Sequence, residues 1–201
     1  KFSIQKLSSE LNDLKGLYQA NRYDVTIHVN KQFPDKYKDY GQKLRFMCNS
    51  AALPGVQILA SDHRRQGFGT FDRRVFGAQI TDIPLTFMLD NKGYVLSFFQ
   101  DWFNRIVYYH PETEHSAQKG TGAQKFEVNY RDNYECQIEI STYDQLSNNI
   151  ITYKLFEAFP FQMGDVTVAW AETDAFSLLP VQFTFRNYKT SRQLVDNSIS
   201  M

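Results

Sequence analysis

Alternation of apolar and polar residues with a period of two, repeated in many short runs, constrains the fold of this 201-residue chain most strongly. The runs cover residues 23–29, 44–48, 136–140, 166–170 and 181–185. Successive side chains of a strand point to opposite faces, so each run indicates a strand with one buried face. The sequence therefore predicts a mainly β protein, built as an antiparallel β-sandwich or barrel.

Two stretches have helical spacing instead. In the first, Ile4, Leu7, Leu11, Leu14 and Tyr18 recur three and four residues apart, which predicts an N-terminal helix. The second follows Asp90 or Asn91, either of which can cap it, and contains Val95, Phe98, Phe99, Trp102, Phe103 and Ile106. Because this internal helix is so aromatic, we expect it to pack against the sheet or close a barrel end.

The chain reads as a single domain, residues 1–201, with 42% hydrophobic residues, enough for a core. We expect an N-terminal helical extension over 1–20, a β core over 22–188 and a polar tail over 190–201. Residues 110–125 are polar and contain two glycines, so they are predicted to form a loop.

The net charge is zero, from 22 basic and 22 acidic residues. Capture of DNA by bulk positive charge is therefore disfavoured, and a neutral protein is poorly protected against self-association. The sequence has no apolar run of 18 residues and no signal-peptide pattern, so we expect a soluble protein made in the cytoplasm. Cys48 and Cys136 lie in strand-like runs, which favours two buried free thiols and leaves a disulfide open.

Residues of the types used in catalysis do not form a recognisable motif. His110, Glu112, Glu114 and His115 share one predicted loop, but they lack the helical i, i+4 spacing of a zinc protease. Gly67-Phe68-Gly69 lacks the third glycine of a dinucleotide fingerprint. We therefore expect no cofactor, no metal site and no enzymatic activity.

A long charged excursion over about residues 57–79 interrupts the strand pattern. Leu53, Pro54 and Gly55 precede it and form a hinge, since Pro removes a ladder donor and Gly permits a sharp change of direction. The excursion carries Arg64, Arg65, Phe68, Phe71, Arg73, Arg74 and Phe76. Asp62 and Asp72 lie among the arginines, which favours ion pairs, within a hairpin or between subunits, over nucleic-acid binding. We expect this segment to be an inter-subunit arm.

Several motifs resemble the tail tube proteins of contractile-tailed bacteriophages. They are Phe46-x-Cys48-x-x-Ala51-Ala52-Leu53-Pro54-Gly55 before the excursion, Thr81 to Phe87 after it, and the internal helix with Phe99, Asp101 and Trp102. Residues 156–160, 166–170 and 181–185 are similar to the C-terminal strands of that family. The resemblance covers roughly residues 22–188 and extends to the tube proteins of contractile injection and secretion systems.

This resemblance implies a structural protein of the virion tail, assembled in the host cytoplasm. Six copies would form a ring, and rings would stack around a lumen through which DNA passes as transient cargo. Partners would be other copies, the tail sheath protein, and baseplate and tube-terminating proteins. The N-terminal helix, residues 30–42 and the tail look like additions, so a baseplate or tube-end protein of the same fold is the alternative. A β-sandwich module that binds carbohydrate or peptide is a further one.

Lumen-facing residues are sought among strand positions that point away from the core. Glu135, Gln137 and Glu139 alternate with Cys136 and Ile138, and a neutral or acidic wall would let DNA slide. These three residues are the candidates, although either sheet could line the lumen.

Overall fold

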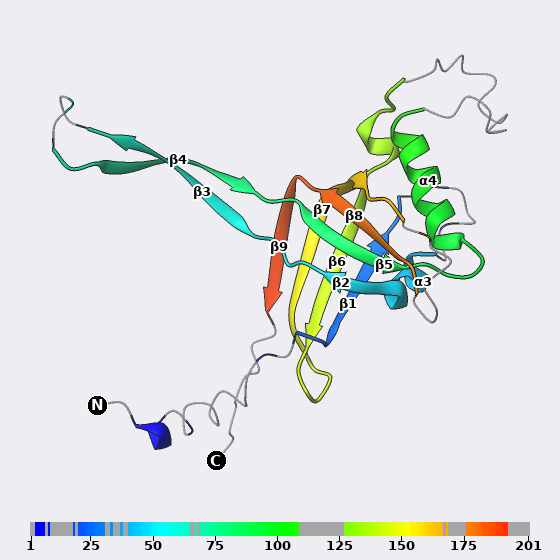
Figure 1. Cartoon of the computed structure of the whole chain (residues 1–201), viewed down its shortest axis with the longest axis horizontal. Coiled ribbons are helices and arrows are strands. Elements are labelled where there is room, and N and C mark those ends of the chain that lie inside the picture. The colour runs from blue at the N-terminus through cyan, green and yellow to red at the C-terminus, as the bar shows by residue number, and fades with distance from the viewer. Residues whose placement is uncertain are drawn as a thin grey trace.

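The computed structural model describes residues 3–6, 8, 18, 20–30, 33, 37, 40–64, 67, 69–108, 127–166, 168 and 176–192. Its main sheet is antiparallel in the order β1-β6-β7-β8-β5-β2, with β9 also paired to β7 (Figure 1). The strands are β1 Tyr23–His28, β2 Cys48–Ala51, β5 Ile83–Met88, β6 Cys136–Tyr143, β7 Asn149–Met163, β8 Leu178–Thr184 and β9 Asn187–Arg192. The mainly β, antiparallel class predicted from the alternation is confirmed.

The long strand β7 divides the main sheet into two parts. Its residues 149–158 pair with β6 and β9, and its residues 159–163 pair with β8. We call β1, β6, β9 and residues 149–158 the first half-sheet, and β2, β5, β8 and residues 159–163 the second half-sheet. The hydroxyl of Tyr23 in β1 donates to the carbonyl of Cys48 in β2, at 3.2 Å, so the two ends of the sheet approach each other as in a barrel.

Helix α4, Tyr94–Ile106, supplies the aromatic centre of the core. The ring of Phe99 lies 4.9 Å from that of Phe87 in β5, and Trp102 lies 5.9 Å from Phe183 in β8. Gly93 is the N-cap residue, with φ 68°, and a carboxylate oxygen of Asp90 accepts a hydrogen bond from the backbone N–H of Val95. Of the two capping residues expected, Asp90 is the one that makes this bond.

The strand expected over residues 44–48 is wrong. Residues 40–47 form helix α3, Tyr40–Met47, and β2 begins only at Cys48. Leu44 is buried and Met47 packs against the core, three residues apart as on one side of a helix, whereas Phe46 is exposed. The run is short enough for its apolar residues to fit a helical turn as well as a strand.

Two described residues of the segment between β1 and α3, which the sequence marked as an addition, pack against α4. Phe33 packs edge-on against Trp102 at 5.5 Å, and the Arg105 guanidinium lies 4.8 Å above the Phe33 ring. Tyr37 donates a hydrogen bond to Asp101 and is buried. These two aromatic residues therefore belong to the core of the molecule.

Other expectations meet the structure only in part. Residues 4–6 are helical, but most of the predicted N-terminal helix, the loop 110–125 and residues 193–201 lie outside the described residues. Val166 and Val168 are not in a strand: β7 ends at Met163, and the Gly164 backbone N–H then donates to the carbonyl of Pro180. β9 extends into the segment expected as a tail, and both cysteines are free thiols. None of the described helices is long and apolar enough to cross a membrane.

Candidate functional site

The excursion is a hairpin that projects from the body of the molecule (Figure 1). Its strands β3, Val56–His63, and β4, Asp72–Ile80, pair only with each other in a separate sheet, and we call them the arm. The expected hinge lies at its base, where the carbonyl of Gly55 accepts hydrogen bonds from the Thr81 backbone N–H and hydroxyl. A Cβ at Gly55 would lie 3.2 Å from that hydroxyl, so glycine allows the close approach.

One side of the arm is apolar. The register pairs Val56 with Ile80, Ile58 with Ala78 and Ala60 with Val75, and these six side chains share a side because they alternate with the polar Gln57, Gln79 and Ser61. Ile58 is 57% exposed and Val75 is 67% exposed. Ile80, at the base, packs against the core, and the other five residues of this side are exposed.

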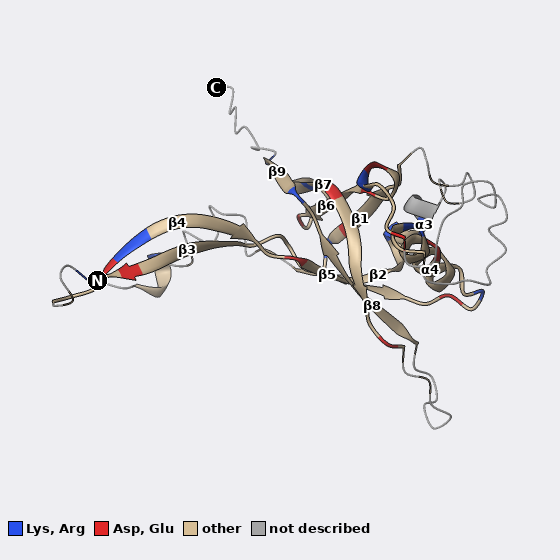
Figure 2. Cartoon of the chain, turned by 90° about the horizontal axis from the view of Figure 1, so that it is seen from above, with Lys and Arg blue, Asp and Glu red and all other residues tan. Residues whose placement is uncertain are grey.

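A β-bulge divides the arm at its middle. Leu59 pairs with Gly77 and Ala60 with Val75, which leaves Phe76 as the extra residue of β4. The proximal part of the arm contains no charged residue, and the charges gather beyond the bulge (Figure 2). The bulge therefore separates an apolar stem from a charged distal part.

The arginines of the distal part have partners within the arm. Arg73 pairs with Asp62 and Arg74 with Asp72, each at 3.0 Å, and the Arg64 guanidinium lies 3.8 Å above the Phe71 ring. Ion pairs within the hairpin, one of the alternatives drawn from the sequence, are thus present. Gly67 and Gly69 have positive φ, as a tight tip requires, whereas Arg65 and Phe68 lie outside the described residues.

Isolated two-stranded hairpins are marginally stable in water, and exposed apolar patches usually mark interaction sites. The arm combines both properties, since it leaves its own sheet and exposes Val56, Ile58, Val75 and Phe76. Burial of the apolar side against another surface would stabilise the hairpin and remove that side from water. The arm therefore has the chemistry of a protein–protein contact.

The outer face of the first half-sheet is charged and internally paired. Glu139 accepts hydrogen bonds from Lys154 at 3.1 Å and His28 at 3.2 Å. Burial alone would raise the pKa of Glu139, but these two partners outweigh it and lower the pKa. Gln137 lies beside His28 in the register, and Lys189 lies opposite Lys154. Two of the expected lumen-facing residues, Gln137 and Glu139, therefore share their face with lysines.

The outer face of the second half-sheet has no charge. Strands β2, β5 and β8 and residues 159–163 contain no acidic or basic residue. Between the buried side chains, their outward positions carry Ser50, Pro84, Thr86, Met88, Leu178, Pro180 and Gln182. Protein surfaces are normally rich in charged side chains, so this face is unusual.

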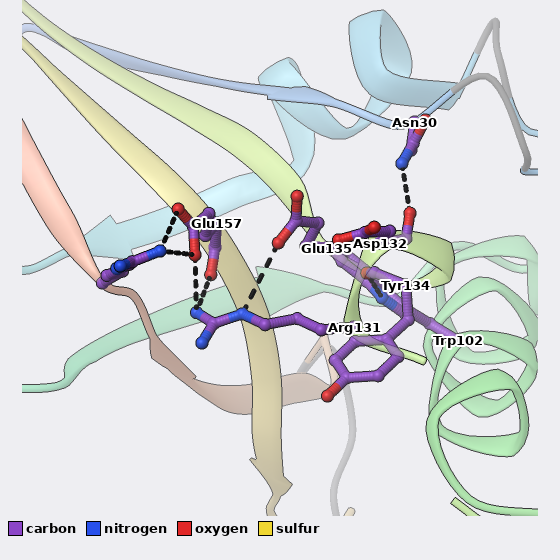
Figure 3. Close-up of polar contacts among 8 residues, drawn as sticks. Asn30, Trp102, Arg131, Asp132, Tyr134, Glu135 and Glu157 are labelled. Atoms are coloured by element: carbon purple, nitrogen blue, oxygen red, sulfur yellow. Dashed lines mark hydrogen bonds and ion pairs between the residues drawn. The ribbon is translucent and has the colours of Figure 1, made fainter. Parts of the chain in front are cut away.

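Glu135, the third expected lumen residue, lies in a cluster of ion pairs at the start of β6 (Figure 3). A carboxylate oxygen of Glu135 lies 3.5 Å from Nε of Arg131, which also contacts Glu157. Burial and the neighbouring carboxylates of Glu157 and Asp132 raise the pKa of Glu135. Glu135 therefore lies among ion pairs just before β6, whereas Gln137 and Glu139 lie within the strand.

A family model described as "Phage tail tube protein" matches residues 18–191, most of the chain and nearly all of the described structure. The chain belongs to the phage tail tube protein family. No curated protein matches the sequence. The family resemblance stated on the motifs around Leu53-Pro54-Gly55 is thus confirmed.

Several solved structures have a similar fold. A chain of the anti-feeding prophage baseplate is similar with a TM-score of 0.58 and 12% identity, covering 88% of this chain and 97% of that one. A chain of an extracellular contractile injection system sheath–tube complex in the extended state is similar with a TM-score of 0.54 and 14% identity, covering 96% of this chain and 99% of that one. A chain of the sheath/tube terminator of such a system is similar with a TM-score of 0.50 and 14% identity, covering 87% of this chain and 96% of that one.

Sequence reasoning predicted residues 57–79 to be an inter-subunit arm but did not single out the aliphatic residues of its stem. It selected aromatic and arginine residues, whereas the continuous apolar side is formed by aliphatic residues such as Val56 and Ile58. The signal was present, because Val56, Ile58 and Ala60 alternate with Gln57 and Ser61 in the printed sequence. Leu59 is an apolar residue at a position where the alternation would have a polar one, and it therefore obscures the pattern.

Proposed function

We propose that the chain is a structural subunit of a phage tail tube, in which six copies form a ring and rings stack around a central lumen. The observation that carries the proposal is the arm, whose apolar side is exposed beyond Ile80 at its base. Membership of the tail tube family supports a structural role without catalysis. In the assembly, the arm of one copy is buried on another copy.

The edge strand β9 supports closure of a ring. Among the described strands, β9 pairs only with β7, so its other edge is open. Proteins usually protect such edges from uncontrolled pairing, and a closed ring protects them by placing each edge against the next subunit. The open edge of β9 is therefore a second contact between copies.

We propose that the uncharged face of the second half-sheet lines the lumen. Lys154 and Lys189 on the first half-sheet would repeat in every copy, and lysines attract phosphate. A face without charges gives a polyanion no point at which to bind. This choice differs from the sequence-based candidates Glu135, Gln137 and Glu139. A matched pair of substitutions, one on each face, can test which face lines the lumen.

The partners and the location follow from the family. The subunit would contact the tail sheath protein and the baseplate and tube-terminating proteins, in a virion tail assembled in the host cytoplasm, with DNA as transient cargo. A baseplate or tube-end protein of the same fold is the second candidate. It is favoured by the likeness to chains of an injection-system baseplate and of a sheath/tube terminator.

Electron microscopy of the purified chain over a wide range of concentration tests the proposal. Long uniform tubes would support the tube subunit, and isolated rings would support the baseplate or tube-end alternative. Monomers at every concentration, with no polymer after addition of a tail initiation complex, would contradict both and favour a binding module.

A further inference from the structure

Strand β7 turns a corner where it passes from the first half-sheet to the second. It pairs with β9 up to Phe156 and with β8 from Phe159 onward. Cys136 pairs with Ala158 and Ile138 with Leu155, so Phe156 and Glu157 lie opposite the single residue Gln137. This β-bulge bends the strand at the point where its neighbours change.

Glu157 adopts a backbone conformation that is unfavourable for its type. Its φ is 53°, in the left-handed region, where a side chain with a Cβ crowds the following carbonyl. Where a bulge needs a left-handed residue, as the G1 type does, glycine usually fills the position. Such a residue persists only when its surroundings hold it in place.

Two arginines hold Glu157 (Figure 3). Nη2 of Arg131 donates to the Glu157 backbone carbonyl at 3.0 Å and lies 3.6 Å from its carboxylate. Nη1 of Arg186 donates to both carboxylate oxygens, at 3.1 and 3.3 Å, and the Arg186 backbone N–H donates to the carbonyl of Phe156. Arg186 lies in the connection from β8 to β9, so its pairing fixes the residue from which β9 starts.

The same cluster is anchored to helix α4. The 3₁₀ turn Arg131–Asn133 lies just before β6, and Nε of Arg105 donates to the carbonyl of Asn133 at 2.9 Å. Nε1 of Trp102 donates to the carbonyl of Tyr134 at 2.8 Å. The turn that carries Arg131 is therefore held against α4 through Asn133 and Tyr134, while the Arg131 guanidinium reaches the corner of β7.

We infer that Arg131, Glu157 and Arg186 form a corner lock that positions β9 against β7 and so presents the open edge of β9 in a fixed orientation. The lock uses the carboxylate of Glu157 to hold its own strained backbone, with Arg131 on one side and Arg186 on the other. Glu157 is a positioning residue in this account. That the presented edge meets another subunit rests on the proposed function, but the positioning of β9 does not.

Hydrogen exchange of the full chain, read by mass spectrometry, tests the lock. Glu157→Ala removes the carboxylate but keeps the strain, and we expect the amides of residues 187–192 to exchange at least about tenfold faster while those of β8 are unchanged. Glu157→Gly relieves the strain as well, so its increase should be smaller. Arg45→Ala, which breaks the ion pair with Asp24 at the opposite edge of the sheet, should leave β9 as it is.

Unchanged exchange of β9 in Glu157→Ala, or equal acceleration in β8 and β9, would overturn the lock. If Glu157→Ala does not fold, Arg186→Gln provides the same comparison, because it removes the pairing without touching the strained residue. Sedimentation of the same variants tests separately whether β9 is a contact between subunits. A loosened β9 with normal assembly would leave the lock standing and show that β9 is not a subunit contact.

Discussion

Ser147 shows how a single residue can work against the stability of the fold. It lies in the turn between β6 and β7 with φ 65°, where Asp144 accepts hydrogen bonds from the backbone N–H groups of Leu146 and Asn148. The hydrogen bonds fix the turn, and the left-handed conformation of Ser147 is the cost.

Ser147→Gly should stabilise the protein. Glycine adopts positive φ without a steric penalty, which more than offsets its greater freedom in the unfolded chain, so we expect the free energy of unfolding to rise by about 0.5 kcal/mol. Urea denaturation measures the change. Ser50→Gly in β2, where φ is not positive, is the matched control and should lower stability, and a lower stability for Ser147→Gly would contradict the account.

Asp90 should make the fold sensitive to acid. Burial alone would raise the pKa of Asp90, but hydrogen bonds from backbone N–H groups, that of Val95 among them, lower it below the usual value. A carboxyl with a lowered pKa contributes stability above its unfolded pKa of about 4, and that contribution disappears as pH falls through its folded pKa. Asp90→Asn should therefore lower the melting temperature at pH 7 and flatten its fall in acid. The exposed Asp82→Asn should change neither, and an unaltered acid profile for Asp90→Asn would exclude this role.

At the scale of elements, the sequence predicts what periodicity encodes. The strands with one buried face and the aromatic helix α4 were recognisable because their periods of 2 and 3.6 are set by backbone geometry. The strand predicted over residues 44–48 was wrong, because so short a run fits both periods. The left-handed Glu157 has no signature at all, since glutamate does not favour positive φ and only the pairing of β7 with three strands imposes it. Phe33 and Tyr37 joined the core through tertiary packing that no local pattern reports.

Helix α4 depends on Trp102 for both packing and orientation. The side chain is fully buried, and its indole N–H donates to the carbonyl of Tyr134. Trp102→Phe should lower the free energy of unfolding by about 1–3 kcal/mol, because it leaves a buried carbonyl unpaired and a small cavity. The exposed Gln100→Ala on the same helix should change stability by less than about 0.5 kcal/mol. Equal effects of the two substitutions in urea denaturation would show that this helix does not order the core as described.

At the scale of the whole molecule, two glutamines distinguish which face lines the lumen. Gln182 lies on the outer face of the second half-sheet and Gln137 on that of the first. A lysine repeated in every copy along a tube attracts phosphate, so tubes of Gln182→Lys should retain duplex DNA at physiological salt, whereas tubes of Gln137→Lys and of the unaltered chain should not. Filter retention of labelled DNA after washing measures this. Retention by Gln137→Lys alone would return the lumen to the face that the sequence suggested.

Assembly of the chain carrying Ile58→Ser and Val75→Ser tests the central claim most directly. Both side chains lie on the apolar side of the arm and outside the core, so circular dichroism and the melting temperature should stay those of the unaltered chain. Full burial of a Val or Ile side chain is worth about 1.5–3 kcal/mol, and the loss of two in every copy should leave electron micrographs without tubes. Gln57→Ser with Gln79→Ser, on the opposite side of the same strands, should assemble normally. Normal tubes from the Ile58 and Val75 variant would contradict the account, because the arm would then not join the subunits.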